Sequence, residues 1–387
     1  MLTYQTAGES HGLGILALVN GFPAGVPIDT NVIDGELRRR QGGYGRGGRQ
    51  AIESDHVKVQ TGILHGQSTG APIGLWVVNR DYKIELMPEL YQPRPGHGDL
   101  SGSLKYFTGI RAILERASAR ETAGRVAAGA LASLLLRPFK IEAVGYVLSV
   151  GPCQLDNASP EPTSARELRE SRDSSALYGR SDRGDEEAIR LINQCREEGD
   201  TLGGVVEVRV FGVPFGLGSH TQWDRKLDGR LAQAVMSVQG FKGVEIGLGF
   251  ESAARPGSQV HDPIEFQPET SAPTFGYTRP SNAAGGIEAG MTNGQTIIVR
   301  AAMKPIATLT KGVASIDLRT GKPALSCYER SDVCAISAAS VVLEHVVAFE
   351  IATALVEKFG GDSLSEMLDR YALYVQAVQK RQHNHWS

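Results

Sequence analysis

The segment that most constrains the fold runs from residue 108 to residue 136, where apolar and small residues recur at helical spacing. Its last part, VAAGALASLLL at 126–136, contains no charged residue. A helix without a polar face has to be buried, and a stretch of 11 residues is too short for a membrane span, which needs about 20. We therefore predict one long helix inside a folded core.

Periodicity and turn residues predict the other elements. Strands are expected at 14–21, 56–64, 73–79, 206–214, 244–250 and 297–305, and helices at 29–40, 224–238, 331–358 and 363–380. Ser331 and Asp332 have the residue types of an N-cap and a first turn. Strands and helices alternate without regular βαβ units, which predicts an α/β or α+β sandwich in which helices pack against sheets.

Two segments follow the same order of strand, Gly/Pro turn, helix and glycine turn. They begin at GFPAGVPID (21–29) and at GVPFGLG (212–218). Internal duplication is one interpretation, and chance repetition of Gly/Pro turns is the other. No low-complexity linker divides the chain, so we expect a single catalytic domain over 1–387, with a polar excursion from the core at 157–200.

Composition restricts the classes of partner. The formal net charge is −3 and aromatic residues make up 6%, which disfavours nucleic-acid binding. No stretch has the pattern of a secretory signal or a membrane span. The four cysteines form no C-x-x-C pair and no zinc spacing with histidine. We therefore expect a cytoplasmic protein with reduced cysteines, no membrane partner and no metal.

Two histidines lie in glycine-rich loops. His11 follows AGES, and His97 stands in PRPGHGD. An exposed histidine titrates near neutrality and suits general acid–base chemistry, although each loop could equally be an ordinary polar turn. GESHG at 8–12 formally matches the nucleophile elbow of hydrolases, but here a strand follows the motif instead of preceding it.

Arginines gather near residues 38–49, RRRQGGYGRGGR. Glycine lets backbone N–H groups approach a ligand, and arginine offers a forked donor, so this stretch predicts a local polyanion site. Arg116 and Arg120 are four residues apart on the predicted helix and would share one face, unless that face is simply solvated. KPIAT (304–308) ends a strand, and RSD (330–332) places an arginine before a predicted helix N-terminus, a second anion site.

Together with the AGGIEAGMTNG loop, these motifs occur in an order that resembles the chorismate synthase family, from residue 3 to about residue 350. The resemblance implies a β-α-β sandwich with antiparallel or mixed sheets, and a homotetramer. It implies a lyase that converts 5-enolpyruvylshikimate 3-phosphate to chorismate and phosphate by 1,4-elimination, the last common step of the shikimate pathway to aromatic amino acids. Reduced FMN is then a required cofactor, without net redox change.

The resemblance also implies residue roles. His11 would protonate the departing phosphate, His97 would protonate reduced flavin near N1, and Asp332 would help N5 take the C6 proton. The implied flavin-binding residues are Arg116, Ala117, Ser118, Gln239, Gly240, Ala289, Lys304, Pro305, Ile306, Ala307, Thr308 and Arg330. Ser10, Arg40, Arg46 and Arg49 would bind substrate, and Arg40 and Arg46 also match positions that bind NADPH. Ala289-Gly290 stands where Gly-Gly is common, and Gln239-Gly240 stands where Asn-Ala is frequent.

Two other functions remain open from the residues alone. YGRGGR is similar to an RGG element of RNA-binding proteins, although it occurs once in an acidic chain. The second alternative is a flavin reductase that uses NADPH. The sequence does not decide whether the protein reduces its own FMN or receives reduced FMN from another enzyme.

Overall fold

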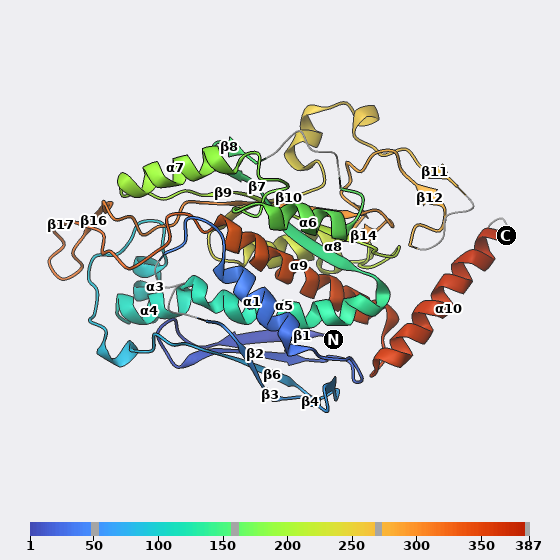
Figure 1. The fold of residues 1–387 in the computed structure, drawn as a ribbon, viewed down its shortest axis with the longest axis horizontal. Coiled ribbons are helices and arrows are strands. Elements are labelled where there is room, and N and C mark those ends of the chain that lie inside the picture. The colour runs from blue at the N-terminus through green and yellow to red at the C-terminus, as the bar shows by residue number, and fades with distance from the viewer. Residues whose placement is uncertain (48–53, 156–161, 268–272, 384–387) are drawn as a thin grey trace.

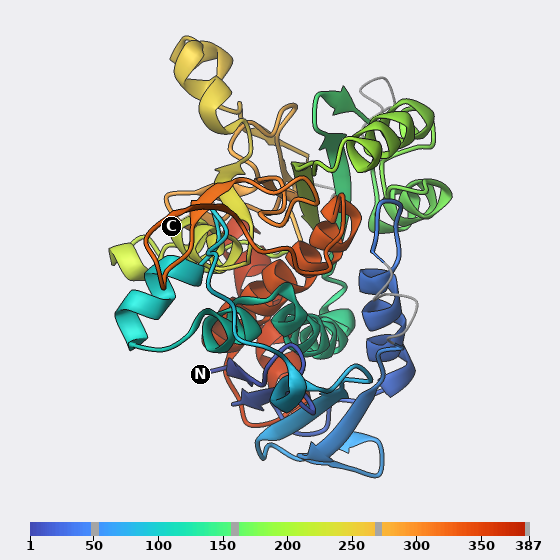
Figure 2. The same ribbon diagram turned by 90° about the vertical axis from the view of Figure 1, so that its left-hand side faces the viewer.

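The computed structural model describes residues 1–387 except 48–53, 156–161, 268–272 and 384–387. The chain forms three layers (Figure 1): one antiparallel sheet, a central layer of helices, and a second antiparallel sheet. Figure 2, turned by 90°, shows the central helices nearly end-on between the two sheets. The predicted β-α-β sandwich is therefore confirmed.

The first sheet has the order β1 (Thr3–Ala7), β2 (Gly14–Asn20), β6 (Ile73–Val78) and β3 (Val57–Thr61). Apolar residues alternate along β2 and β6, and Ala17, Val19, Ile73 and Leu75 are fully buried. That apolar face packs on α5 (Thr122–Leu136), which also contacts α1 (Thr30–Gln41). Period-two apolar residues thus place one face of the sheet against the helices, as the alternation predicts.

The second sheet has the order β10 (Phe241–Ile246), β15 (Ile297–Met303), β9 (Gly204–Phe211), β7 (Glu142–Val150) and β8 (Cys153–Gln154). Its inner face packs on α9 (Ile336–Phe359), and α8 (Leu227–Met236) contacts both α9 and β10. The polar segment 157–200 carries α6 (Ala165–Ser174) and α7 (Asp185–Glu197), and α6 packs on β7 and β9.

The two sheets share one connectivity. Numbered along the chain, the main strands of each sheet occur in the spatial order first, second, fourth, third: β1-β2-β6-β3 and β7-β9-β15-β10. A helix joins the second to the third strand in both halves, α1 in one and α8 in the other, and α5 and α9 follow the fourth strands. This correspondence supports the internal duplication suggested by the repeated Gly/Pro turns.

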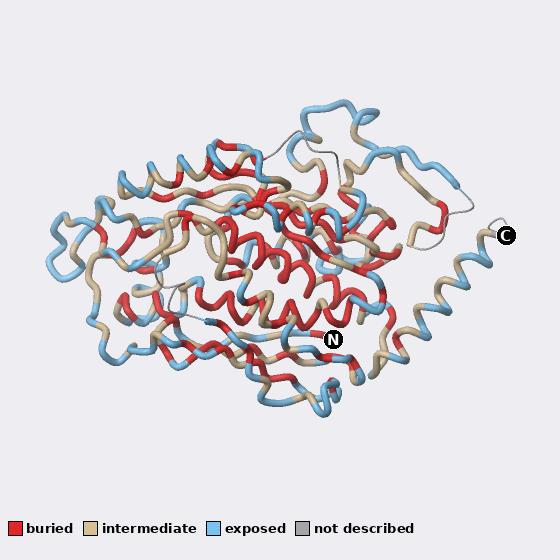
Figure 3. The backbone as a smooth tube through the Cα atoms, in the orientation of Figure 1, coloured by how far each residue is buried: buried red, intermediate tan, exposed pale blue. Residues whose placement is uncertain are grey.

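The helices α5 and α9 form the centre of the core, where buried residues are concentrated (Figure 3). A Cβ atom on Gly129 of α5 would lie 2.2 Å from the carbonyl oxygen of His345, so this close approach requires glycine. By length and composition α9 could cross a membrane, but 89% of its apolar window is buried inside the protein. It is therefore explained as a core helix. The last helix, α10 (Leu364–His383), projects from the body (Figure 1).

The predicted helix over 108–136 is wrong in one respect, because it is broken in the middle. The helix α4 (Ile110–Ala117) ends at Ser118, whose backbone is extended, and a short 3₁₀ turn (Ala119–Glu121) precedes α5. The Ser118 hydroxyl accepts a hydrogen bond from the Arg120 N–H and donates one to Ser10 Oγ. Arg116 and Arg120 therefore do not share a helix face.

The strand expected at 56–64 is divided between β3 and β4 (Ile63–Leu64). Two other boundaries differ for reasons that the contacts and the backbone show. The helix α9 begins at Ile336 and not at Ser331, because Asp332 is bonded to Gly47 and Arg46 instead of capping a helix. The strand expected at 244–250 is β10, which ends at Ile246. Gly247 and Gly249 have φ values of 59° and 57°, a left-handed conformation that ends the strand.

Candidate active site

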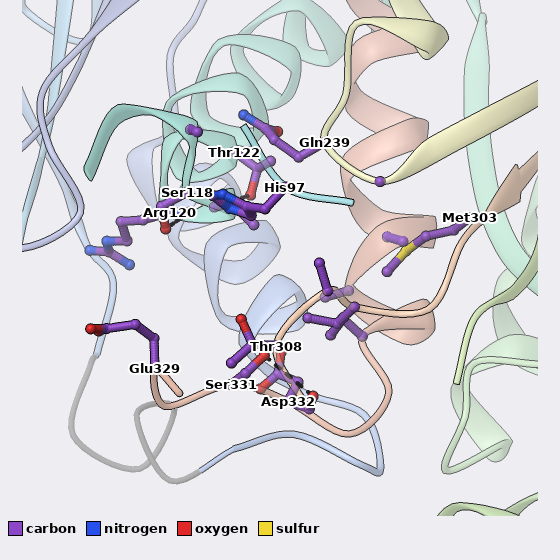
Figure 4. A pocket seen from close by; sticks show the side chains of 18 of the residues that line it. His97, Ser118, Arg120, Thr122, Gln239, Met303, Thr308, Glu329, Ser331 and Asp332 are labelled. Atoms are coloured by element: carbon purple, nitrogen blue, oxygen red, sulfur yellow. Dashed lines mark hydrogen bonds between the residues drawn. The ribbon is translucent and has the colours of Figure 1, made fainter. Parts of the chain in front are cut away.

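A cavity of about 460 Å³ lies where the loops of both halves meet at the central helices, within the size range of small-molecule sites. Its walls come from the loop after β1, the end of α1, the loop before α3 (Asp99–Tyr106) and the α4–α5 break. The ends of α8 and β15 and the segment before α9 complete it. Figure 4 shows His97 and Ser118 on one side of this cavity, with Thr308, Ser331 and Asp332 on another. The break in the helix over 108–136 thus supplies part of the wall.

His11 is held by a carboxylate behind it. Its Nδ1 lies 2.9 Å from Glu115 Oε1, and its backbone N–H donates to Glu115 Oε2 at 2.7 Å. Burial alone would raise the pKa of Glu115, but the hydrogen bonds from His11 dominate and hold that pKa below its ordinary value. An ionised Glu115 accepts the Nδ1–H of His11, which leaves Nε2 to exchange a proton with a ligand.

His97 has the same arrangement on another loop. Its Nδ1 contacts Asp99 Oδ1 at 2.5 Å, and Asp99 also accepts from Arg94 Nε at 2.8 Å. Burial opposes ionisation of Asp99, yet the hydrogen bonds from His97 and Arg94 hold its pKa well below the usual range. Arg94 Nη1 also donates a hydrogen bond to Thr308 Oγ1 at 2.9 Å. Both predicted acid–base histidines therefore line one cavity, each oriented by a buried carboxylate.

Two buried arginines form a cationic corner around one carboxylate. Asp55, whose side chain is 0% exposed, accepts from Arg40 Nη2 at 2.6 Å and from Arg120 Nη1 at 2.8 Å. Burial lowers the pKa of Arg40, although arginine stays charged in proteins. Among the described residues, Asp55 is the carboxylate that both guanidiniums share, and Arg40 and Arg120 also line the cavity, where they can receive an anion.

The glycine-rich loop reaches the opposite wall. Arg46 Nη1 lies 2.7 Å from Asp332 Oδ2, and the Gly47 N–H donates to Asp332 Oδ1 at 2.6 Å. Lys304 also lines the cavity, and its ammonium group donates to the carbonyl oxygen of Gly96. Burial and the nearby Lys242 lower the pKa of Lys304. These contacts join the loop at 42–47 to the segment before α9.

Unpaired polar atoms mark where a ligand fits. Arg40 Nε, Arg46 Nε and Gln239 Oε1 are buried and have no hydrogen-bond partner among the described residues. Buried polar groups normally have partners. Beside them is an apolar wall formed by Val238, Phe241, Met303, Ala339 and Val342. An apolar surface next to the guanidiniums of Arg40 and Arg46 fits a flat heterocycle with a phosphate, as in FMN, together with an anionic substrate.

The structure brings together most of the residues expected from sequence. The following line the cavity: Ser10, His11, Arg40, Arg46, His97, Ala117, Ser118, Gln239, Gly240, Lys304, Pro305, Ile306, Ala307, Thr308, Arg330 and Asp332. Arg116 does not, because its guanidinium donates to the carbonyl oxygens of Thr6 and Gly8. Ala289 is exposed at the turn between β13 (Ile287–Glu288) and β14 (Met291–Thr292). Arg49 lies outside the described residues.

Sequence reasoning missed several residues of the site. Asp55 stands in a polar stretch without a motif, and Asn79 ends an apolar strand. Arg94 could have been found, because it lies inside the PRPGHGD motif three residues before His97. Asp55 and Asn79 belong to no motif, and they bond Arg120 across 65 and 41 residues of sequence.

One further cluster lies outside the cavity. Glu36, Glu344 and His345 have possible metal-ligating atoms within 4.8 Å of one another. Glu344 is already bonded to Arg39 and Arg172. We explain this cluster as a buried ion-pair network between α1, α9 and α6.

The fold and the cavity define an enzyme that holds a small polyanion beside a flat apolar surface, with two carboxylate-backed histidines. The chain belongs to the chorismate synthase family, whose model matches residues 2–356. It is 51% identical to the chorismate synthase of Desulforamulus reducens over 98% of this chain and 100% of that relative. It is 48% identical to that of Enterococcus faecalis over 97% of this chain and 100% of the relative. A crystal structure of a chorismate synthase superimposes with a TM-score of 0.81 at 41% identity, covering 98% of both chains.

Enzymes of this family are lyases that catalyse the final step of the shikimate pathway, which forms chorismate for aromatic amino acid biosynthesis. They act on a small molecule and use reduced FMN. The predictions of family, reaction and cofactor are thereby confirmed.

Proposed function

We propose that His11, His97 and Asp332 carry the proton transfers of the family's reaction in this chain. The observation that carries the proposal is the pair of carboxylate-backed histidines on one cavity. Each histidine has its Nδ1 engaged, which orients the ring and supports proton transfer from the other nitrogen. The bare geometry alone would suit either direction of proton transfer.

We place His11 at the leaving group. The guanidinium groups of Arg40 and Arg120 would stabilise the negative charge that develops on the departing phosphate, and Arg46 would bind a further anionic group of the substrate. His11 would deliver a proton from Nε2 to the phosphate oxygen. Ser10, next to it, is held by Ser118 and would complete the contacts to the substrate.

Reduced FMN, when bound, supplies the transient electron that weakens the C–O bond, and no net oxidation results. Ala117, Ser118, Gln239, Gly240, Lys304–Thr308 and Arg330 would hold it against the apolar wall. His97 would be the second proton donor of the cavity. Asp332, bonded to Arg46 and the Gly47 N–H, would assist removal of the C6 proton.

Three further points belong to the same proposal. The enzyme would be a homotetramer and would act in the cytoplasm, with no nucleic-acid or membrane partner. Arg49, Arg116 and Ala289 would contribute to ligand binding, although Arg116 and Ala289 do not line the cavity of the single chain. NADPH would serve only as a source of reduced flavin, through this protein or through a separate reductase.

An anaerobic assay with pre-reduced FMN and 5-enolpyruvylshikimate 3-phosphate tests the proposal. The wild-type protein should form chorismate, and His11→Ala should lower kcat about 100-fold or more, as for loss of a general acid. Unchanged turnover of a folded His11→Ala protein would refute the assigned role. Adding NADPH and oxidised FMN in place of reduced FMN determines which source of reducing power the protein uses.

A further inference from the structure

The loop that carries His11 is held by one buried amide. The Nδ2 group of Asn79 lies 3.0 Å from the carbonyl oxygen of Glu9, 3.1 Å from that of Ser10 and 2.8 Å from that of Gly12. Its two protons are thus shared among three acceptors on both sides of His11. Asn79 is fully buried, with 0% of its surface exposed.

The backbone after Asn79 completes the attachment of this loop. The carbonyl oxygen of His11 accepts from the N–H groups of Lys83 and Ile84, at 3.0 and 3.2 Å. The carbonyl oxygen of Leu13 accepts from the N–H of Asn79 at 3.0 Å. Every carbonyl oxygen from residue 9 to residue 13 is therefore bonded by residues 79–84. Glu115 independently fixes the imidazole from the other side.

The other end of the same amide faces the cationic corner. Asn79 Oδ1 accepts from Arg120 Nε at 2.7 Å, and Arg120 Nη1 contacts both oxygens of Asp55 at 2.8 and 2.9 Å. The reversed amide would place N–H groups against a guanidinium and an oxygen against three carbonyls. Only one orientation satisfies both ends, so the side chain must be an amide and not a carboxylate.

We propose that Asn79 is a positioning residue for His11, an inference that rests on the proposed role of His11 as general acid. Asn79 does not itself line the cavity, but it is bonded to two residues that do, Ser10 and Arg120. Its function is to fix the position and orientation of the His11 imidazole relative to Arg120, the arginine that would face the leaving group. Misplacement of a catalytic group by about 1 Å can cost about 100-fold in rate.

The contacts predict a separation of kcat from KM. In Asn79→Ala, Arg120 keeps its two bonds to Asp55 and should still bind substrate, whereas the carbonyl oxygens of Glu9, Ser10 and Gly12 lose the amide donor that they share. We expect kcat to fall at least about ten-fold and substrate KM to change less than about three-fold. Asn79→Asp should be slower still, because a carboxylate would face the three carbonyl oxygens.

The decisive experiment places Asn79→Ala in the His11→Ala background, with reduced FMN under anaerobic conditions. A residue that acts through His11 should cause no further loss of kcat once His11 is absent, because effects within one functional unit are not additive. His11→Ala alone tests the acid, so failure of that role is distinguished from failure of the positioning. An equal, multiplicative loss in both backgrounds would show a purely structural role and overturn the inference.

Ser68→Ala provides the matched control. Ser68 is buried, and its hydroxyl accepts from the Val26 N–H and donates to the Pro23 carbonyl oxygen, which holds another turn in place. It does not line the cavity. It should lower the melting temperature without changing kcat. The solvent isotope effect on kcat should rise in Asn79→Ala and not in Ser68→Ala, since an unfolded fraction leaves isotope effects unchanged. Should Asn79→Ala not fold, Asn79→Ser, which keeps one donor, should show the same pattern; an unchanged kcat in either folded variant refutes the proposal.

Discussion

Replacing Asp55 by asparagine tests the cationic corner most directly. Asn retains the volume of the side chain but removes the charge that Arg40 and Arg120 share, and it turns N–H groups toward a guanidinium. Because the carboxylate is 0% exposed, water cannot replace it. Removing one partner of a buried ion pair costs about 3–5 kcal/mol, and here two guanidiniums lose the same partner. We therefore expect a loss near 5 kcal/mol, within typical total stabilities of about 5–15 kcal/mol.

The effect should depend on pH with a defined sign. Burial alone would raise the pKa of Asp55, but Arg40 and Arg120 dominate and hold it below its ordinary value. A lowered folded-state pKa contributes stability that is fully present above the unfolded pKa, about 4, and is lost as the pH falls through the folded value. The difference between wild type and Asp55→Asn should therefore be constant near pH 7 and shrink below about pH 4.

Urea unfolding followed by circular dichroism, at one fixed protein concentration, measures this difference. Asp200→Asn is the control, because Asp200 pairs with Lys311 at the surface, where an ion pair contributes at most about 1 kcal/mol. Inorganic phosphate should restore more stability to Asp55→Asn than to wild type, since it can replace the missing carboxylate. A loss below about 1 kcal/mol at pH 7, or one that persists unchanged at pH 3, would refute the reasoning.

Three further predictions concern ligands. Arg46→Ala should raise the substrate KM about thirty-fold or more, from a charge-assisted contact of about 2–5 kcal/mol, and Arg46→Lys should recover only part of it because lysine lacks the fork; equal KM values in steady-state assays would contradict this. The melting temperature of Arg46→Ala should also fall, because Asp332 loses its ion pair with Arg46. His97→Ala should lower kcat about 10- to 1000-fold with little change in far-ultraviolet circular dichroism; loss of the fold instead would assign His97 a structural role. FMN titrated by fluorescence should bind more tightly with substrate present, and identical affinities would argue against one shared cavity.

The sequence determined the elements whose signal is local. Apolar spacing predicted the central helices and the strands β2, β3, β6, β9, β10 and β15, because period and burial are linked within one element. It missed β1 in the first sheet and β7 and β8 in the second. Glycine-flanked His11 and His97 and the arginine-glycine loop identified the chemistry, since loops with such residues are typical of binding sites. The repeated Gly/Pro turns indicated the duplication that the two matching sheet connectivities support.

Only the tertiary structure decided which distant residues hold these site residues in place. Glu115 lies 104 residues from His11, and Asp55 lies 65 residues from Arg120, so no local pattern could link them. The long-range bond between Ser10 and Ser118 accompanies the break in a segment that helical spacing read as continuous. Asp332 likewise bonds Arg46 instead of capping α9. A local pattern reflects how a residue contributes to its own helix or strand. A buried charge or amide, by contrast, is held by whichever residue provides its hydrogen bonds, and that residue can be distant in sequence.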